Sequence, residues 1–182
     1  GIQLPTLIMY LHGFYVHNGS QMQIRDPESV RKVVASARKQ SPVADDPKFS
    51  VVRDTEVGSP VMVYTPEGEP SFWMAPFLVK NSACGFAYVE LSGKVSKLGI
   101  FGSTPEDRPS WVDASFFKNP PDALFAEIRA KFSGSTISEP IFSYDTSPAR
   151  WAWRIEIKNK IKSIIFITPG GWYEQQPKDN CR

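Results

Sequence analysis

Apolar residues recur along this chain at two different spacings, and each spacing predicts one kind of element. Between residues 26 and 41 they follow the i, i+3, i+4, i+7 pattern of one helical face. The members of this stripe are Val30, Val33, Val34 and Ala37. Asp26 can cap the free backbone N–H groups, and Pro27 has its φ angle preset for a first turn. We therefore predict a helix that starts at Asp26 and ends before Ser41-Pro42.

A second helical stripe lies between Asn119 and Phe132. Its apolar members are Leu124, Phe125, Ile128 and Phe132. Pro120 and Pro121 suit a first turn, and Gly134 suits a left-handed cap behind the last one. Each of the two predicted helices precedes a strand-rich stretch, which predicts a helix followed by a meander in both halves of the chain.

The clearest strand, residues 150–158, alternates between two kinds of side chain. One face is apolar and consists of Trp151, Trp153, Ile155 and Ile157. The other carries Arg150, Ala152, Arg154, Glu156 and Lys158, and this period of two predicts one buried and one solvated face. The strand at residues 70–79 is apolar on both faces, which predicts that something covers its second side.

These two strands belong to a longer repeat. The segment Tyr64–Asn81 returns in altered form as Tyr144–Asn159. Tyr64 aligns with Tyr144 and Trp73 with Trp151, so the second copy has a loop shorter by two residues, after which the match has no gaps. A repeat of this length predicts one supersecondary unit built twice. We thus predict an α+β protein of two tandem repeats, each a helix packed on an antiparallel meander.

The predicted organisation has five parts. They are an N-terminal segment (1–25), a first helix-plus-sheet repeat (26–103), a linker (104–118), a second repeat (119–177) and a tail (178–182).

Two stretches of the first repeat resemble a known family. The aromatic strand PSFWMAPFLV and the run GFAYVELSGKVSKLGIFG, with a turn at Gly93-Lys94, resemble PepSY-like and cystatin-like propeptide domains. The second repeat departs from this pattern, since Lys158-Asn159-Lys160 replaces the Gly-Lys turn. The resemblance implies a non-catalytic domain that inhibits a peptidase or binds a ligand outside the cytoplasm. It carries over no catalytic residue.

Composition limits the possible compartments and partners. The chain is 41% hydrophobic and 22% charged, as in a folded globular domain, and its net charge of +2 is too small to indicate nucleic acid. The apolar run Leu7–Leu11 is far shorter than the roughly 20 residues of a membrane helix. The first residue is Gly1 rather than Met, so we expect a removed leader or anchor and a secreted or cell-surface, membrane-proximal location.

Catalytic and metal-binding patterns are weak. Leu11-His12-Gly13 is similar to the oxyanion loop of α/β-hydrolases, but no G-x-S-x-G nucleophile turn occurs. The spacing of His12 and His17 suits neither a helix face nor a strand face as a metal site, so we predict loop histidines. We predict no enzyme activity, no metal and no cofactor.

Cys84 and Cys181 either form one disulfide or are a buried thiol and a tail thiol, and the strand context of Cys84 favours the second. The basic stripe of residues 150–162 lies beside tryptophans on the opposite face, which argues against nucleic-acid binding and for a solvated outer face.

The prediction for function is therefore a binding module. We expect an extracytoplasmic module that regulates a peptidase or binds another protein, with a carrier of small hydrophobic ligands, bound between sheet and helices, as the alternative. The candidate contact residues are apolar side chains with no assigned place in a core: Phe72, Met74, Trp111, Phe116 and Phe117. These residues could instead close the seam between the two repeats.

Overall fold

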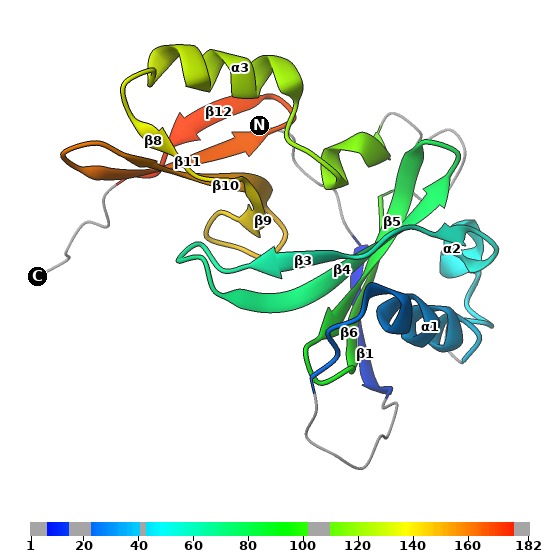
Figure 1. The fold of residues 1–182 in the computed structure, drawn as a ribbon. Helices are drawn as coiled ribbons and strands as arrows, with labels where there is room; N and C mark the ends of the chain where they lie inside the picture. Colours follow the sequence, from blue (N-terminus) through cyan, green and yellow to red (C-terminus); the bar gives the residue numbers. More distant parts are fainter. Residues whose placement is uncertain (1–6, 15–22, 41–42, 102–109, 177–182) are drawn as a thin grey trace, which may run out of the picture. The chain divides into compact units, whose positions relative to one another are not determined.

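The chain folds into two compact units (Figure 1). The computed structural model describes residues 23–40, 43–101 and 110–176 in full and residues 7–14 as backbone. The N-terminal unit contains the described residues up to Val63 together with 70–118. The C-terminal unit contains those from Asn119 onward and, in addition, the turn Tyr64–Glu69. The prediction of an α+β protein with antiparallel sheets is confirmed.

The N-terminal unit is built on a seven-stranded sheet with the order β1-β6-β5-β4-β2, in which β3 also pairs with β4 and β7 with β5. Its strands are β1 (Leu7–Phe14), β2 (Glu56–Val57), β3 (Val61–Tyr64), β4 (Pro70–Val79), β5 (Ser82–Glu90), β6 (Val95–Ile100) and β7 (Val112–Asp113). Its helices are α1 (Pro27–Arg38), α2 (Ser50–Arg53) and the 3₁₀ turns η1 (Pro47–Phe49) and η3 (Ala114–Phe117).

Helix α1 covers one face of this sheet (Figure 1). Asp26 caps it by accepting a hydrogen bond from the Glu28 N–H at 3.2 Å, as the sequence predicts. Its apolar stripe is buried in one cluster with Trp73, Ala75 and Phe77 of β4. The predicted first helix and its core face are therefore confirmed.

The opposite face of the same sheet is aromatic. The Phe86 ring lies 4.8 Å from Tyr88 and 5.5 Å from Phe101, between ring centroids. All three side chains are buried, and so is Met74 of β4. Burial on both faces of β4, predicted from its unbroken apolar sequence, is thus confirmed.

The C-terminal unit is built on a second, five-stranded sheet with the order β12-β11-β10-β8, in which β9 also pairs with β10. Its elements are α3 (Asp122–Lys131), β8 (Thr136–Ile137), β9 (Ile141–Tyr144), β10 (Trp151–Lys158), β11 (Lys162–Thr168) and β12 (Gly171–Glu174). On one face, Phe142 packs against Trp151 and Trp153. Phe132, the residue directly after α3, contacts this face, with its ring centroid 6.1 Å from that of Trp172.

The two sheets share a strand order. In each, a long strand pairs on one side with a two-residue and a four-residue strand and on the other side with the following strand. Val57 pairs with Phe77 in the first sheet, and Ile137 pairs with Ile157 in the second. Ile137 lies as many residues after Val57 as Ile157 lies after Phe77. This register matches Trp73 with Trp153, whereas the sequence alignment matched Trp73 with Trp151.

Two segments that were predicted to lie outside the repeats form strands, and one predicted helix cap is absent. Part of the predicted N-terminal segment forms β1, which pairs with β6. Part of the predicted linker forms β7, which pairs with β5 through Ala83 and Val112. Neither strand was recognised from its own sequence pattern, because each is defined by hydrogen bonds to a strand that is distant in the chain. Gly134 does not adopt the left-handed conformation, so the predicted cap of α3 is wrong.

Candidate functional site

The six-residue turn Tyr64–Glu69 is closed by hydrogen bonds of its own. The Thr65 N–H donates to the Glu69 carbonyl at 2.7 Å, and the Gly68 N–H donates to the Thr65 carbonyl at 2.8 Å. The Thr65 hydroxyl accepts from the Glu69 N–H at 3.1 Å. Pro66 has a φ angle that suits a turn, and Gly68, at φ +95°, adopts a conformation that side chains disfavour. The local sequence thus specifies a tight turn.

Side chains of the second sheet hold this turn by its backbone. The Ser143 hydroxyl lies within hydrogen-bonding distance of two carbonyls, Tyr64 at 2.8 Å and Thr65 at 3.1 Å. Arg154 Nε donates to the Pro66 carbonyl at 2.8 Å. Ser143 is fully buried and Arg154 is only 5% exposed. Two buried side chains of β9 and β10 therefore contact three successive carbonyl groups of the turn, and the single Ser143 hydroxyl proton serves two of them.

Arg154 is paired on its other side with a carboxylate. Its Nη2 donates to Glu156 Oε1 at 2.9 Å, and Lys162 Nζ lies 3.2 Å from the same oxygen. The hydrogen bond from Arg154 is the main cause that lowers the pKa of Glu156. A buried guanidinium needs such a partner because an unpaired charge is costly away from water. The ion pair thus permits Arg154 to stay buried beneath the turn.

The outer side of the turn presents acidic groups. Glu67 and Glu69 are exposed, whereas Thr65, Pro66 and Gly68 are half-buried. A Cβ atom added to Gly68 would lie 3.3 Å from Arg154 Nη1, so the glycine also lets the turn approach the arginine closely. We call residues 64–69 with Ser143 and Arg154 the held turn. Chemically, it is a hydrogen-bonded turn with two exposed glutamates.

A second polar group lies on β12 and the loop after β9. The Tyr173 hydroxyl donates to Asp145 Oδ2 at 2.6 Å, and Arg150 Nη2 lies 3.9 Å from the same oxygen. Partial burial is the main cause that raises the pKa of Tyr173, and the hydrogen bond to Asp145 adds to it. The neutral tyrosine therefore acts as a donor that fixes the Asp145 loop.

The five predicted contact residues are mostly inside the protein. Met74 is 0% exposed, and Phe116 and Phe117 are 6% and 5% exposed. Phe72, which packs against Tyr88 at 4.6 Å, and Trp111 are half-buried. The expectation that these side chains form an exposed surface is wrong for Met74, Phe116 and Phe117. Met74 lies opposite Tyr88 on the aromatic face of the sheet, and the rings of Phe116 and Phe117 pack against each other at 6.0 Å. Their role in binding stays a prediction.

The predicted solvated face of β10 is also wrong at its centre. Ala152 and Arg154 are buried, since the held turn lies over this part of the strand. Arg150, Lys158, Lys160 and Lys162 are exposed, as predicted.

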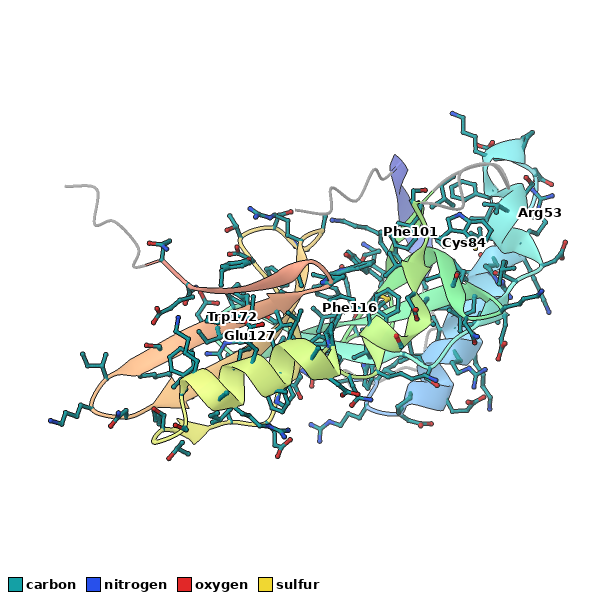
Figure 2. All side chains as sticks on the ribbon, turned by 90° about the horizontal axis from the view of Figure 1, so that it is seen from above. Arg53, Cys84, Phe101, Phe116, Glu127 and Trp172 are labelled. Carbon is teal, nitrogen blue, oxygen red and sulfur yellow. The ribbon has the colours of Figure 1, made fainter. Side chains whose placement is uncertain are left out.

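Cys84 is a buried thiol, as the strand context predicts (Figure 2). It donates to the Phe77 carbonyl at 3.5 Å, and burial is the main cause that raises its pKa to about 11. Cys181 and His17 lie outside the described residues, and of His12 only the backbone is described. Among the residues with described side chains, no group of three or more His, Cys, Asp or Glu could hold a metal ion.

Sequence reasoning missed Ser143 and Arg154 as parts of a site. One signal was present, because the residues at the equivalent positions of the first sheet are the buried Val63 and Met74. A hydroxyl and a guanidinium at positions that are apolar in the first sheet indicate a polar partner. The partner itself, 79 residues before Ser143, could not be read from local pattern.

No family model, no curated protein and no solved structure matches this chain. Within the described part of the chain, no helix is long and apolar enough to cross a membrane.

Proposed function

We propose that this protein is a non-catalytic binding module that acts outside the cytoplasm and regulates a peptidase. The held turn is the part that it presents to this partner. The proposal covers a protein partner and includes neither nucleic acid nor a cofactor. The extracytoplasmic location rests on the resemblance to PepSY-like and cystatin-like propeptide domains.

One observation carries this proposal: six hydrogen-bonding contacts fix a turn of six residues. Three lie within the turn and three come from Ser143 and Arg154. A loop that is ordered before binding loses little conformational entropy on binding, and this smaller entropic cost raises the affinity. Complexes between peptidases and their inhibitors typically form with little backbone movement. Rigidity of this kind supports an inhibitor-like role.

The chemistry of the turn supports a partner with a basic cleft. Glu67 and Glu69 are the exposed residues of the turn, whereas the Tyr64, Thr65 and Pro66 carbonyls face Ser143 and Arg154, so the two acidic residues lie on the side open to a partner. Opposite charges across an interface steer association and fix orientation. We therefore infer that the partner's contact site carries Arg or Lys.

The shared strand order supports a further part of the proposal, namely that the two sheets are one helix-plus-sheet unit built twice. The pair Val57–Phe77 of the first sheet recurs as Ile137–Ile157 in the second, with both residues shifted by the same number of positions. In this proposal the connection between β3 and β4 became the presented turn, and β9 and β10 acquired the polar side chains that hold it.

An inhibition assay tests the function. The purified protein at low micromolar concentration is incubated with trypsin, papain, pepsin and thermolysin, and the rate of substrate cleavage is measured. We expect the wild type to inhibit at least one of the four. Glu67→Gln/Glu69→Gln and Arg154→Met should each raise the inhibition constant roughly tenfold or more, since the first removes the displayed charges and the second loosens the turn.

Glu139→Gln is the matched control, because Glu139 is an exposed glutamate of the same unit outside the turn. It should inhibit like the wild type. Absence of inhibition of all four enzymes by the wild type would overturn the peptidase-regulating function, and unchanged inhibition by the turn variants would remove the turn from it.

The alternative of a small hydrophobic ligand carrier stays a prediction from the sequence. A thermal-shift panel of fatty acids and sterols separates it from the proposal above, since a ligand at 100 times its dissociation constant adds about 2.7 kcal/mol of stability.

A further inference from the structure

The tip of the β10–β11 hairpin combines an exposed apolar side chain with three lysines. Residues 158–162 read Lys-Asn-Lys-Ile-Lys, and all five are exposed. Ile161 is 80% exposed, whereas Tyr173, the other exposed large hydrophobic side chain among the described residues, reaches 36%. This turn forms the free end of the hairpin (Figure 1, orange). We call these five residues the basic tip.

The stability of the hairpin does not explain this arrangement. Lys158 and Lys162 are direct cross-strand partners in the β10–β11 ladder, and like charges in that position repel each other. Of the three lysines, only Lys162 has a carboxylate nearby, with its Nζ 3.2 Å from Glu156 Oε1. Ion pairs of Lys158 and Lys160 are absent from the described part of the chain. The tip therefore retains a local excess of positive charge around one apolar side chain.

We propose that the basic tip docks on an anionic lipid surface. An apolar side chain that enters the boundary between head groups and acyl chains gains hydrophobic free energy, and lysines beside it meet lipid phosphates. Ile161 supplies the first group, and Lys158, Lys160 and Lys162 supply the second. The tip needs no rearrangement to do this, because all four side chains are already exposed.

The residue types favour a lipid surface over nucleic acid. Proteins that bind single strands stack bases on aromatic side chains. At this tip the apolar residue is an isoleucine, and the tryptophans of β10, Trp151 and Trp153, are buried on the other face of the strand. An exposed isoleucine has no stacking surface to offer a base, but it can enter a bilayer. The inference is independent of the held turn and of the peptidase partner.

Vesicle sedimentation with the full chain tests this proposal. Sucrose-loaded vesicles of phosphatidylcholine alone are compared with vesicles in which about one lipid in three is the anionic phosphatidylglycerol, at about 0.1 M salt. We expect sedimentation with the anionic vesicles only. Ile161→Ser should lower the partition coefficient roughly tenfold, and Lys158→Gln/Lys160→Gln should lower it roughly fivefold for each lysine. Both variants alter exposed side chains, and Lys158→Gln also removes the repulsion of Lys162, so their melting temperatures should not fall below that of the wild type.

Lys118→Gln is the matched control, since Lys118 is an exposed lysine of the N-terminal unit, and it should leave the partition coefficient unchanged. A second measurement uses Ile161→Trp and brominated lipid, where bromine should quench the variant's emission more than that of the wild type. Equal binding to both vesicle types, or binding unaffected by Ile161→Ser, would overturn the proposal. So would lysine-dependent binding to a single-stranded oligonucleotide without any binding to vesicles.

Discussion

At Gly85 the backbone of the first sheet leaves no room for a side chain. A Cβ atom there would lie 2.5 Å from the Gly99 carbonyl oxygen and 2.9 Å from Val52 Cγ1. The first contact is with backbone, which cannot rotate away. We expect Gly85→Ala to lower the free energy of unfolding by about 2 to 3 kcal/mol, measured by urea denaturation.

Gly134→Ala provides the comparison for this glycine. Nothing lies within 4 Å of the position that the added methyl group would occupy, and the backbone there is not left-handed. Its unfolding free energy should stay within about 0.5 kcal/mol of the wild type or rise slightly. Equal effects of the two substitutions would mean that steric contact at Gly85 is not what requires glycine.

The buried Cys84 thiol predicts a stability change at alkaline pH. Its pKa is raised from near 9 to about 11, chiefly by burial. Unfolding returns the thiol to water, so between these pH values the unfolded chain binds fewer protons than the folded one. Stability is then present below about pH 9 and is lost as the pH rises toward 11.

The measurement compares the wild type with Cys84→Ala by urea denaturation at pH 8 to 11. We expect the wild type to lose about 1.4 kcal/mol per pH unit more than the variant between about pH 9 and pH 11. Any effect of Cys181 is common to both proteins and cancels. If the unfolding free energies of the wild type and Cys84→Ala changed equally with pH, the Cys84 thiol would not be the group responsible for the alkaline loss.

At the scale of elements, strand β10 depends on one buried arginine. Arg154→Met keeps much of the side-chain volume but leaves the Pro66 carbonyl and Glu156 without this partner. We expect the free energy of unfolding to fall by about 2 to 3 kcal/mol, less than the roughly 3 to 5 kcal/mol for breaking a fully buried pair, because Glu156 is 24% exposed. Arg150→Met, which alters an exposed arginine of the same unit, should change it by less than about 1 kcal/mol.

The same pair sets a dependence on acid. Because Arg154 lowers the pKa of Glu156, the carboxylate stabilises the fold above the ordinary glutamate pKa, and this contribution is lost as the pH falls below it. Arg154→Met should therefore lose less stability than the wild type between pH 5 and pH 3, followed by circular dichroism in urea. A steeper acid loss in the variant would show that the pair does not act in this direction.

Elements with strong local signals were predicted from sequence, and elements defined by distant partners were not. The cap at Asp26 and the stripe from Val30 to Ala37 lie within one helix, so the sequence pattern contains them completely. Strand β7 is two residues long, and its pairing with β5 is a property of the sheet rather than of its own residues. Short edge strands of this kind have no periodicity to read.

The held turn shows the same limit for a site. Its own turn chemistry, with Pro66 and Gly68, is visible in the sequence, but the two residues that bind it lie 78 to 88 positions away. The alternation of β10 correctly separated its two faces. It could not show that a turn covers Arg154, because a period of two identifies faces and not their neighbours. The charged face was therefore interpreted as solvated.

At the scale of the whole molecule, the C-terminal unit carries both proposed binding regions. Arg154, under the held turn, and Lys158, at the start of the basic tip, are four residues apart on the same face of β10. Four residues of strand span about 13 Å. Lys162 of the tip shares Glu156 with Arg154. Lys158 and Lys160 have no ion pair in the described part of the chain, so substitutions at these two lysines should leave the held turn unchanged.

This independence gives a prediction for the intact protein. Lys158→Gln/Lys160→Gln should abolish most vesicle binding and leave peptidase inhibition at the wild-type level, and Glu67→Gln/Glu69→Gln should do the reverse. With the wild type alone, the most strongly inhibited enzyme of the panel should co-sediment with anionic vesicles, since one copy of the chain binds both. Mutations at sites without shared partners usually add independently. If the lysine variant also lost inhibition, the tip would have to belong to the peptidase contact, and the two regions would be one.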